Sequence, residues 1–320
     1  MTDIARYQGA NGALIALHHD EFARAAALPA TSSAGMLSGV AGIGRDRPWH
    51  LVPPLRTRSG RATRATGIVD PMSLVTFERR GHVAVITLNR PEARNAINPE
   101  MARAIGGAVD QLEDDPDLRV GVLAATVTEP RPVFCAGDDL RAIEGEPAMT
   151  EKGHFAGFVR YPRRKPIVAA VDGLATSGGC EIVLACDLVV ATTRSSFALA
   201  EVKWSLAPLA GGAFRLPRLI GRAAALDMIL TGQALSAERA YQLGIVSTLT
   251  EGDAVEAAVE RAQLIADHDP ETVSTNLELA NRALTMGEDE LWAANAEFAE
   301  RIFSSPTFKS GLAAFDNRKS

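Results

Sequence analysis

The spacing of apolar residues becomes regular only after Met72 and then switches between the periods of strands and helices. Short apolar or alternating segments predict strands over residues 74–79, 82–88, 120–125, 133–134, 167–171, 188–191, 196–198 and 245–249. Helical spacing predicts helices over residues 99–112, 180–186, 214–220, 223–230 and 236–243. Three amphipathic helices follow, with apolar stripes over 255–265, 273–284 and 291–302. The repeated order of strand, strand and helix favours a layered α/β core with a helical C-terminal part.

Residues 1–71 have a different character. They contain eight Arg, no Lys and five acidic residues, and residues 29–64 are rich in Gly, Ser, Ala and Pro without a sustained period. Such a segment offers too little patterned apolar surface to order itself. We therefore expect a disordered extension over 1–71, with Met72 as a candidate natural start of the protein.

Composition narrows the class of protein. The 320 residues are 47% hydrophobic and 22% charged, which suits a globular protein with a sizeable core. A net charge of −6 argues against nucleic acid or an anionic membrane as a partner. Cys135, Cys180 and Cys186 lack CxxC spacing, so we expect reduced thiols in a cytoplasmic protein. No apolar run reaches the roughly 18 residues of a membrane span.

The stretch from Lys165 to Asp187 carries the clearest chemical signal. A buried strand runs into a turn of small residues, and an apolar helix with one charge, Glu181, follows the turn. Residues 134–138 repeat the strand-to-turn design, and each turn lies beside an acidic residue. Two such turns can aim backbone N–H groups at one point and form an oxyanion hole. Each turn taken alone is more often a plain glycine-rich connection, and the presence of two beside acidic residues favours the oxyanion hole.

Two glutamates and two aspartates are candidate reactive groups. Glu181 lies in an apolar helix, where an ionised carboxylate is rare unless it is paired, used in chemistry or placed at the helix N-terminus. Glu201 precedes a glycine-containing loop, and a residue of this kind, taken alone, is more often a surface charge. Asp138 and Asp139 lack neighbouring acids or histidines at metal-site spacing, so we expect no metal site. Asp139 is better explained as a cap of the following segment.

A rival interpretation starts from Ser177. The sequence Ala175-Thr-Ser-Gly-Gly179 is a variant of the nucleophile elbow between a strand and a helix. A serine hydrolase also needs a histidine base, and the one histidine downstream is His268, at the polar end of a helix. The sequence therefore favours Ser177 as a replacement for glycine in a tight turn.

A set of short motifs occurs in a fixed order along the chain after Met72. They are Leu88-Asn-Arg-Pro-Glu-Ala-Arg-Asn-Ala96, Phe134-Cys-Ala-Gly-Asp-Asp-Leu140, Lys165-Pro-Ile-Val-Ala-Ala-Val-Asp-Gly173, Ser177-Gly-Gly-Cys-Glu181, Ala185-Cys-Asp187, Phe197-Ala-Leu-Ala-Glu201, Ala210-Gly-Gly212, Arg215-Leu-Pro217, Leu230-Thr-Gly232 and Leu243-Gly-Ile-Val246. Each motif alone is weak. In this order and spacing they make the chain resemble the enoyl-CoA hydratase/isomerase (crotonase) superfamily.

The resemblance implies a fold and a site. The fold is a crotonase-like α/β spiral of ββα units over residues 72–265. A C-terminal helical region, 266–320, forms homotrimers that are commonly paired into hexamers. The oxyanion hole falls at the backbone N–H groups of Asp138 and Gly178, and Glu181 and Glu201 fall on both carboxylate positions of the hydratases. The coenzyme A positions are Arg94, Ala136 and Arg141, with Phe315 and Arg318 reaching the coenzyme A of a neighbouring subunit.

The chain also departs from the family pattern. Ser177 interrupts what is usually a run of three glycines, Ser205 replaces a common glycine, and Leu209 stands where hydratases often have a glycine amide beside the water. Trp204, Leu206 and Leu209 could line an acyl pocket, although core packing explains them equally well. These departures leave room for a specialised substrate.

The function that the resemblance implies is hydration of a 2-enoyl-CoA in fatty acid β-oxidation or related acyl-CoA catabolism. We expect no metal or separate cofactor, because coenzyme A is part of the substrate. An enoyl-CoA isomerase, or a dehydratase of a polar acyl-CoA, is the nearest alternative on the same fold. A catalytically silent acyl-CoA-binding protein is the alternative from another class.

Overall fold

A computed structural model describes residues 73–141, 145–305 and 307–311. The predicted extension over 1–71 and the predicted coenzyme A contacts Phe315 and Arg318 lie outside the described residues. Within the described ranges, no helix is long and apolar enough to cross a membrane.

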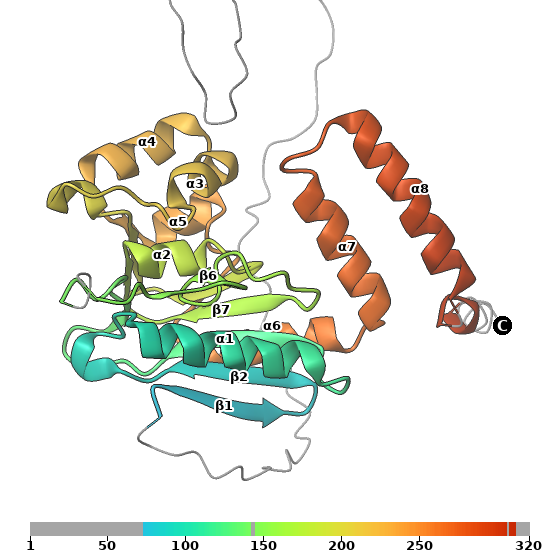
Figure 1. Cartoon of the computed structure of the whole chain (residues 1–320), viewed down its shortest axis with the longest axis horizontal. Helices are drawn as coiled ribbons and strands as arrows, with labels where there is room; N and C mark the ends of the chain where they lie inside the picture. Colours follow the sequence, from blue (N-terminus) through green and yellow to red (C-terminus); the bar gives the residue numbers. More distant parts are fainter. Residues whose placement is uncertain (1–72, 142–144, 306, 312–320) are drawn as a thin grey trace, which may run out of the picture. The chain divides into compact units, whose positions relative to one another are not determined.

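The larger sheet has six strands in the order β1-β2-β3-β7-β9-β12. Figure 1 labels β1, β2 and β7 of this sheet. β1 and β2 form an antiparallel hairpin, and each of the remaining neighbours is parallel. The residue bounds are β1 Val75–Arg80, β2 Val83–Leu88, β3 Val120–Ala125, β7 Ile167–Val171, β9 Leu188–Thr192 and β12 Thr248–Thr250. The apolar runs predicted as buried strands are therefore confirmed, apart from the last.

The predicted strand over 245–249 is displaced. Ile245 and Val246 are buried, but their N–H groups bond to the carbonyl of Ala240 at the end of the preceding helix. Bonding to β9 begins only at Ser247, whose N–H donates to the Val189 carbonyl, and the strand itself begins at Thr248. The apolar character of residues 245–246 thus reflects a buried helix-ending turn rather than a strand.

A smaller sheet of short strands leads into the two turns that were predicted to form an oxyanion hole. Its order is β11-β10-β8-β4, and β4, β8 and β10 run parallel. The bounds are β4 Val133–Cys135, β8 Leu174–Thr176, β10 Ser196–Ala198 and β11 Leu235–Ser236, with a separate hairpin of β5 Met149–Thr150 and β6 His154–Phe155. β8 lies inside the segment predicted as an unbroken turn, because three residues are too few to show a period. Each of β3, β7 and β9 is followed by a strand of this sheet, which produces the predicted spiral.

Helices cover both faces of the larger sheet. Alternate residues of β2 face opposite ways: Ile86 packs in one core cluster with α1, and Val85 packs in the other with α6. α6 contacts the sheet through Ala254, Ala258 and Ala262. The bounds are α1 Pro99–Asp114, α2 Gly178–Val183, α3 Gly212–Ile220, α4 Arg222–Thr231, α5 Ala237–Leu243, α6 Ala254–Ala266, α7 Pro270–Arg282 and α8 Glu288–Ser304, with 3₁₀ turns η1 Pro91–Ala93 and η2 Glu201–Trp204.

α7 and α8 pack against each other as a helical pair (Figure 1). Arg301 of α8 bonds to the Thr275 hydroxyl and pairs with Glu271 at 2.7 Å. The guanidinium groups of Arg282 and Arg301 also lie over the ring of Phe298. The predicted apolar stripe of α8 is buried at Ala294 and Phe298, whereas Ala280 and Leu284 of the predicted α7 stripe are exposed. Trimer formation through this region stays a prediction.

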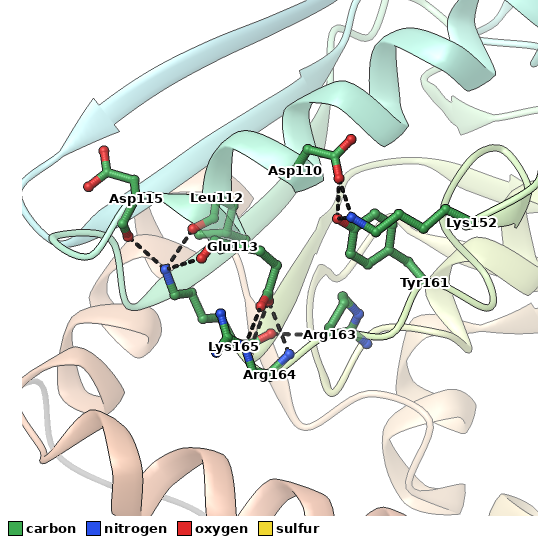
Figure 2. A network of polar contacts seen from close by, with 9 residues as sticks. All are labelled: Asp110, Leu112, Glu113, Asp115, Lys152, Tyr161, Arg163, Arg164 and Lys165. Carbon is green, nitrogen blue, oxygen red and sulfur yellow. Dashed lines mark hydrogen bonds and ion pairs between the residues drawn. The ribbon is translucent and has the colours of Figure 1, made fainter.

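Polar contacts fix the entry to β7, as Figure 2 shows. The Lys165 ammonium donates to the carbonyls of Leu112, Glu113 and Asp115 at 2.7, 3.1 and 2.7 Å, which closes the C-terminal end of α1. The Glu113 carboxylate accepts from the N–H groups of Arg164 and Lys165. α1 and the start of β7 are thereby held together.

We expect Lys165→Met to lower the free energy of unfolding by about 2 kcal/mol, because three carbonyls at a helix end lose a charged donor. Urea unfolding followed by circular dichroism measures the change. Lys309→Met is the control, since that side chain is exposed, and its effect should stay within about 0.5 kcal/mol. An equal effect of both substitutions would contradict the capping role of Lys165.

Candidate active site

The register of the smaller sheet brings distant residues to one place. In the parallel pairing, Ala198 of β10 lies opposite Thr176 of β8, and Ala175 of β8 lies opposite Cys135 of β4. The segments that leave these strands therefore emerge side by side. A cavity of about 340 Å³ opens there. It is lined by Ala136, Asp138, Leu140, Met149, His154, Phe155, Thr176, Ser177, Gly178, Glu181, Ala200, Glu201, Trp204, Leu206, Ala207, Leu209 and Ala210.

Two backbone N–H groups in this cavity are left without partners in the surrounding secondary structure. Ile97 bonds to the Gly137 carbonyl and to the Asp139 N–H, so the N–H of Asp138 points away from Ile97. Gly178 is the first residue of α2 and has no acceptor within the helix. A Cβ on Gly137 would lie 2.8 Å from the nitrogen of Gly178, so the two turns approach closely. The pairing of turns expected from the sequence is therefore present.

Ser177 occupies a backbone conformation that suits glycine. Its φ of 51° and ψ of −128° lie outside the regions that residues with a Cβ normally populate. This explains why glycine is usual at the position, and it confirms that Ser177 replaces a glycine in a tight turn. Ser205, the second serine in a glycine position, likewise has a left-handed φ of 58°.

We expect Ser177→Gly to raise the free energy of unfolding by about 1 kcal/mol, because glycine adopts this conformation without strain. Ser177→Ala keeps the Cβ and should give no gain, which makes it the matched control. Urea titration of the three proteins measures the difference. A gain with alanine equal to the gain with glycine would argue against backbone strain as the cause.

Glu181 is buried in the wall of the cavity. It lies in α2, its exposure is 3%, and Oε1 accepts from the Gly212 N–H at 2.8 Å. Burial raises the pKa of Glu181 to about 7, and the negative charge of Glu201 adds to the rise. The N–H groups of Gly212 and Ala210 and the Arg215 guanidinium oppose it. Glu181 is therefore poised to gain or lose a proton near neutral pH.

Glu201 faces the same cavity with no hydrogen-bond partner. It begins η2 directly after β10, its exposure is 7%, and both of its carboxylate oxygens are buried and unpaired. Burial raises the pKa of Glu201. A buried carboxyl group without a partner is costly in the free protein, which is typical of a group kept for a ligand. The surface-charge interpretation of Glu201 is wrong.

The remaining predicted site residues divide into two groups. Ala136, Trp204 and Leu209 line the cavity, and Trp204 and Leu209 are 68% and 83% exposed, so core packing does not explain them. Arg94 and Arg141 are exposed and are not among the lining residues. The Arg94 carbonyl accepts from the Ala136 N–H, which places the Arg94 loop next to the oxyanion turn.

Three contributors to the site were not predicted from the sequence. His154 and Phe155 line the cavity from the β5–β6 hairpin, in a segment whose sequence shows no clear period. The Gly212 N–H that binds Glu181 belongs to a recognised motif, Ala210-Gly-Gly212, but nothing in the motif indicates its partner. Asp139, expected as a cap, does accept from the Arg141 N–H and also pairs with Arg90.

The serine-hydrolase interpretation finds no support in the geometry. His268 is exposed and does not line the cavity that contains Ser177. Among the described residues, no hydrogen bond connects the Ser177 hydroxyl to a histidine.

A spiral of paired strands around a cavity with two buried carboxyl groups defines a crotonase-like α/β protein. Comparison with known proteins makes this specific, because the family model for enoyl-CoA hydratase/isomerase matches residues 78–320. The chain belongs to this family.

Individual relatives agree with that assignment. The chain is 36% identical to "Enoyl-CoA hydratase EchA19" of Mycobacterium tuberculosis, over 80% of this chain and 97% of the relative. It is also 36% identical to "(E)-benzylidenesuccinyl-CoA hydratase" of Thauera aromatica, over 77% of this chain and 96% of the relative. A crystal structure of an enoyl-CoA hydratase from Mycobacterium tuberculosis H37Rv superposes with a TM-score of 0.72 at 38% identity, covering 77% of this chain and 96% of that one. The predicted crotonase fold is confirmed.

Proposed function

We propose that this protein is a hydro-lyase that adds water reversibly across the 2,3 double bond of a 2-enoyl-CoA. The observation that carries the proposal is the pair of buried carboxyl groups in one cavity, with both oxygens of Glu201 unpaired. Two carboxyl groups can hold and split one water, whereas moving a double bond requires only one. Relatives named as hydratases support the same reaction class.

The proposed mechanism assigns the thioester carbonyl to the N–H groups of Asp138 and Gly178. These donors stabilise the enolate oxygen that develops when water attacks C3, and one such donor is worth about 10²–10³ in rate. Glu181 accepts a proton from the attacking water, and protonated Glu201 delivers a proton to C2. The C2–C3 π electrons thus end in the new C2–H bond. Each turnover leaves Glu181 protonated and Glu201 ionised, and a proton exchange between them through water restores the starting state.

The coenzyme A portion of the substrate activates the acyl chain for the reaction and provides groups that the protein can bind. Its thioester makes the C2 position acidic, so the proposed reaction needs no metal or separate cofactor. We propose that Arg94, Ala136 and Arg141 contact it, because their loops adjoin the oxyanion turn. Phe315 and Arg318 of a neighbouring subunit would complete the site in a trimer or hexamer. The proposed role is acyl-CoA catabolism in the cytoplasm.

The direct test is hydration of crotonyl-CoA and longer 2-enoyl-CoAs, followed by loss of the absorbance of the conjugated thioester. Turnover on any chain length supports the proposal. Binding of coenzyme A thioesters without turnover would instead favour a silent acyl-CoA-binding protein. Isomerisation of a 3-enoyl-CoA that survives Glu201→Gln would favour the isomerase.

We expect kcat/KM for hydration to rise with pH through about 7. The sign follows from the role of Glu181: as a base it must be ionised, and its pKa of about 7 leaves it mostly protonated below that value. Initial rates on crotonyl-CoA, measured between about pH 5 and 9 in steps of about one pH unit, give the profile. In Glu181→Gln this rising limb should disappear together with most of the activity. A wild-type profile that is flat from about pH 5 to 8 would contradict the assignment of the base.

A further inference from the structure

His154 shares an unusual property with Glu201. Its Nδ1 is buried and has no hydrogen-bond partner. Among the described residues, His154 and Glu201 are the only two with a buried, unpaired side-chain nitrogen or oxygen, and both line the same cavity. Most buried polar groups in proteins are hydrogen-bonded, so an exception beside a ligand cavity indicates a partner that the ligand brings. The proposed hydration chemistry uses Glu201 but gives His154 no role.

The position of His154 is held from two sides. Its φ of 59° is left-handed, a conformation that histidine adopts more readily than most residues with a Cβ. In β6 it pairs with Thr150, and its neighbour Phe155 packs on the oxyanion turn, with the ring 2.7 Å from where a Cβ on Gly178 would lie. The hairpin that carries the imidazole is therefore fixed against the reacting end of the cavity.

The electrostatics of the cavity limit the group that His154 can bind. Asp138, Glu181 and Glu201 contribute three carboxyl groups, and none of the described lining residues is Lys or Arg. A carboxylate on the acyl chain would meet like charge here without a compensating cation. A neutral imidazole, in contrast, has one N–H donor and one acceptor nitrogen. An uncharged hydroxyl or carbonyl group satisfies it without adding charge.

We propose that His154 is a specificity-determining residue, and that the acyl chain of the physiological substrate carries an uncharged hydroxyl or keto group that hydrogen-bonds to it. This inference rests on the proposed hydratase function and names its substrate class. A plain alkyl chain leaves the imidazole nitrogen unpaired, whereas a hydroxylated chain pairs it. One such hydrogen bond is worth about tenfold in kcat/KM.

The test compares 2-hexenoyl-CoA with its 4-hydroxy, 5-hydroxy and 6-hydroxy derivatives, and the readout is the ratio of kcat/KM values. The wild-type protein should prefer at least one hydroxylated substrate about tenfold. His154→Phe keeps a ring without hydrogen-bonding groups and should bring the ratio close to one. His154→Asn tolerates the left-handed backbone, keeps a donor and an acceptor, and should retain part of the preference. His268→Leu, at an exposed histidine outside the cavity, is the control and should keep the wild-type ratio.

The outcomes distinguish the proposed role of His154 from the proposed hydratase function. Failure to hydrate any of the four thioesters refutes the hydratase function, and the role of His154 falls with it. Hydration of all four at equal kcat/KM, or a preference that survives in His154→Phe, leaves the hydratase function standing and refutes the role of His154. If His154→Phe fails to fold, as judged by its melting temperature, His154→Gly replaces it, because glycine suits the backbone and also removes the imidazole.

Discussion

Replacing Glu201 by glutamine is expected to lower kcat for hydration of crotonyl-CoA by about three orders of magnitude, with a much smaller change in KM. Glutamine has nearly the same shape but cannot donate and recover a proton at C2, and general acid–base catalysis contributes roughly 10²–10⁴ in rate. The side chain is buried and its carboxylate oxygens are unpaired. The substitution therefore removes the proton that Glu201 must donate, without breaking a hydrogen bond in the free protein.

The same reasoning predicts a gain in stability for Glu201→Gln, or at least no loss. A buried carboxyl group without a partner destabilises the folded state, and a neutral amide destabilises it less. A simple folding defect would lower activity and stability together. Steady-state kinetics with a thermal melt of the same sample separates the two. Glu251→Gln, at an exposed turn after β12, is the control and should change neither quantity. Retention of more than about a tenth of the wild-type kcat by Glu201→Gln would refute its assignment as the acid.

The two carboxyl groups are distinguished by their surroundings. Glu181 accepts a hydrogen bond from the Gly212 N–H, which favours its ionised form, whereas no other residue donates a hydrogen bond to Glu201. Both pKa values are raised by burial. One carboxyl group of the pair is stabilised as the anion and the other is not. Such a pair can supply one base and one acid. This difference is the physical reason for assigning the base to Glu181.

Much of the fold could be predicted from the sequence, because long elements carry a period. The buried strands of the larger sheet and the amphipathic helices α1, α6, α7 and α8 were predicted at nearly their observed positions. β8 has three residues and pairs with the distant strands β4 and β10, whereas β5 and β6 have two residues each and pair only with each other. Strands this short show no alternating pattern, so these elements could not be predicted from the sequence.

The site was predictable to the extent that its residues lie in motifs. Asp138, Gly178, Glu181 and Glu201 belong to recognisable segments, and the parallel register of β4, β8 and β10 then brings them to one cavity. His154 belongs to no motif, and its significance appears only through its burial and its missing partner. A property of that kind depends on the packing of the whole site.

Replacing Gly137 by alanine is expected to lower kcat for hydration by about 10²–10³, which is the loss of one oxyanion donor. Two features of the backbone lead to this expectation. The added Cβ would lie 2.8 Å from the nitrogen of Gly178, closer than real Cβ atoms approach other atoms, and the φ of 95° is one that alanine rarely adopts. Both force the turn to move, and the two N–H groups of Asp138 and Gly178 then no longer converge on one oxygen.

Gly107→Ala is the matched control for Gly137→Ala. A Cβ at Gly107, within α1, meets no atom within 4 Å beyond its chain neighbours and the backbone of its own helix, so the substitution should leave kcat unchanged and stabilise the helix by about 0.5–1 kcal/mol. The kinetics of both variants on crotonyl-CoA, with unfolding in urea measured on the same preparations, test the pair of expectations. A distorted oxyanion hole affects kcat more than KM, because the donors bind the developing enolate more tightly than the ground-state carbonyl. If Gly137→Ala folds and keeps its kcat within about threefold of the wild type, the polarising donors must lie elsewhere, since losing even one donor would cost far more than that.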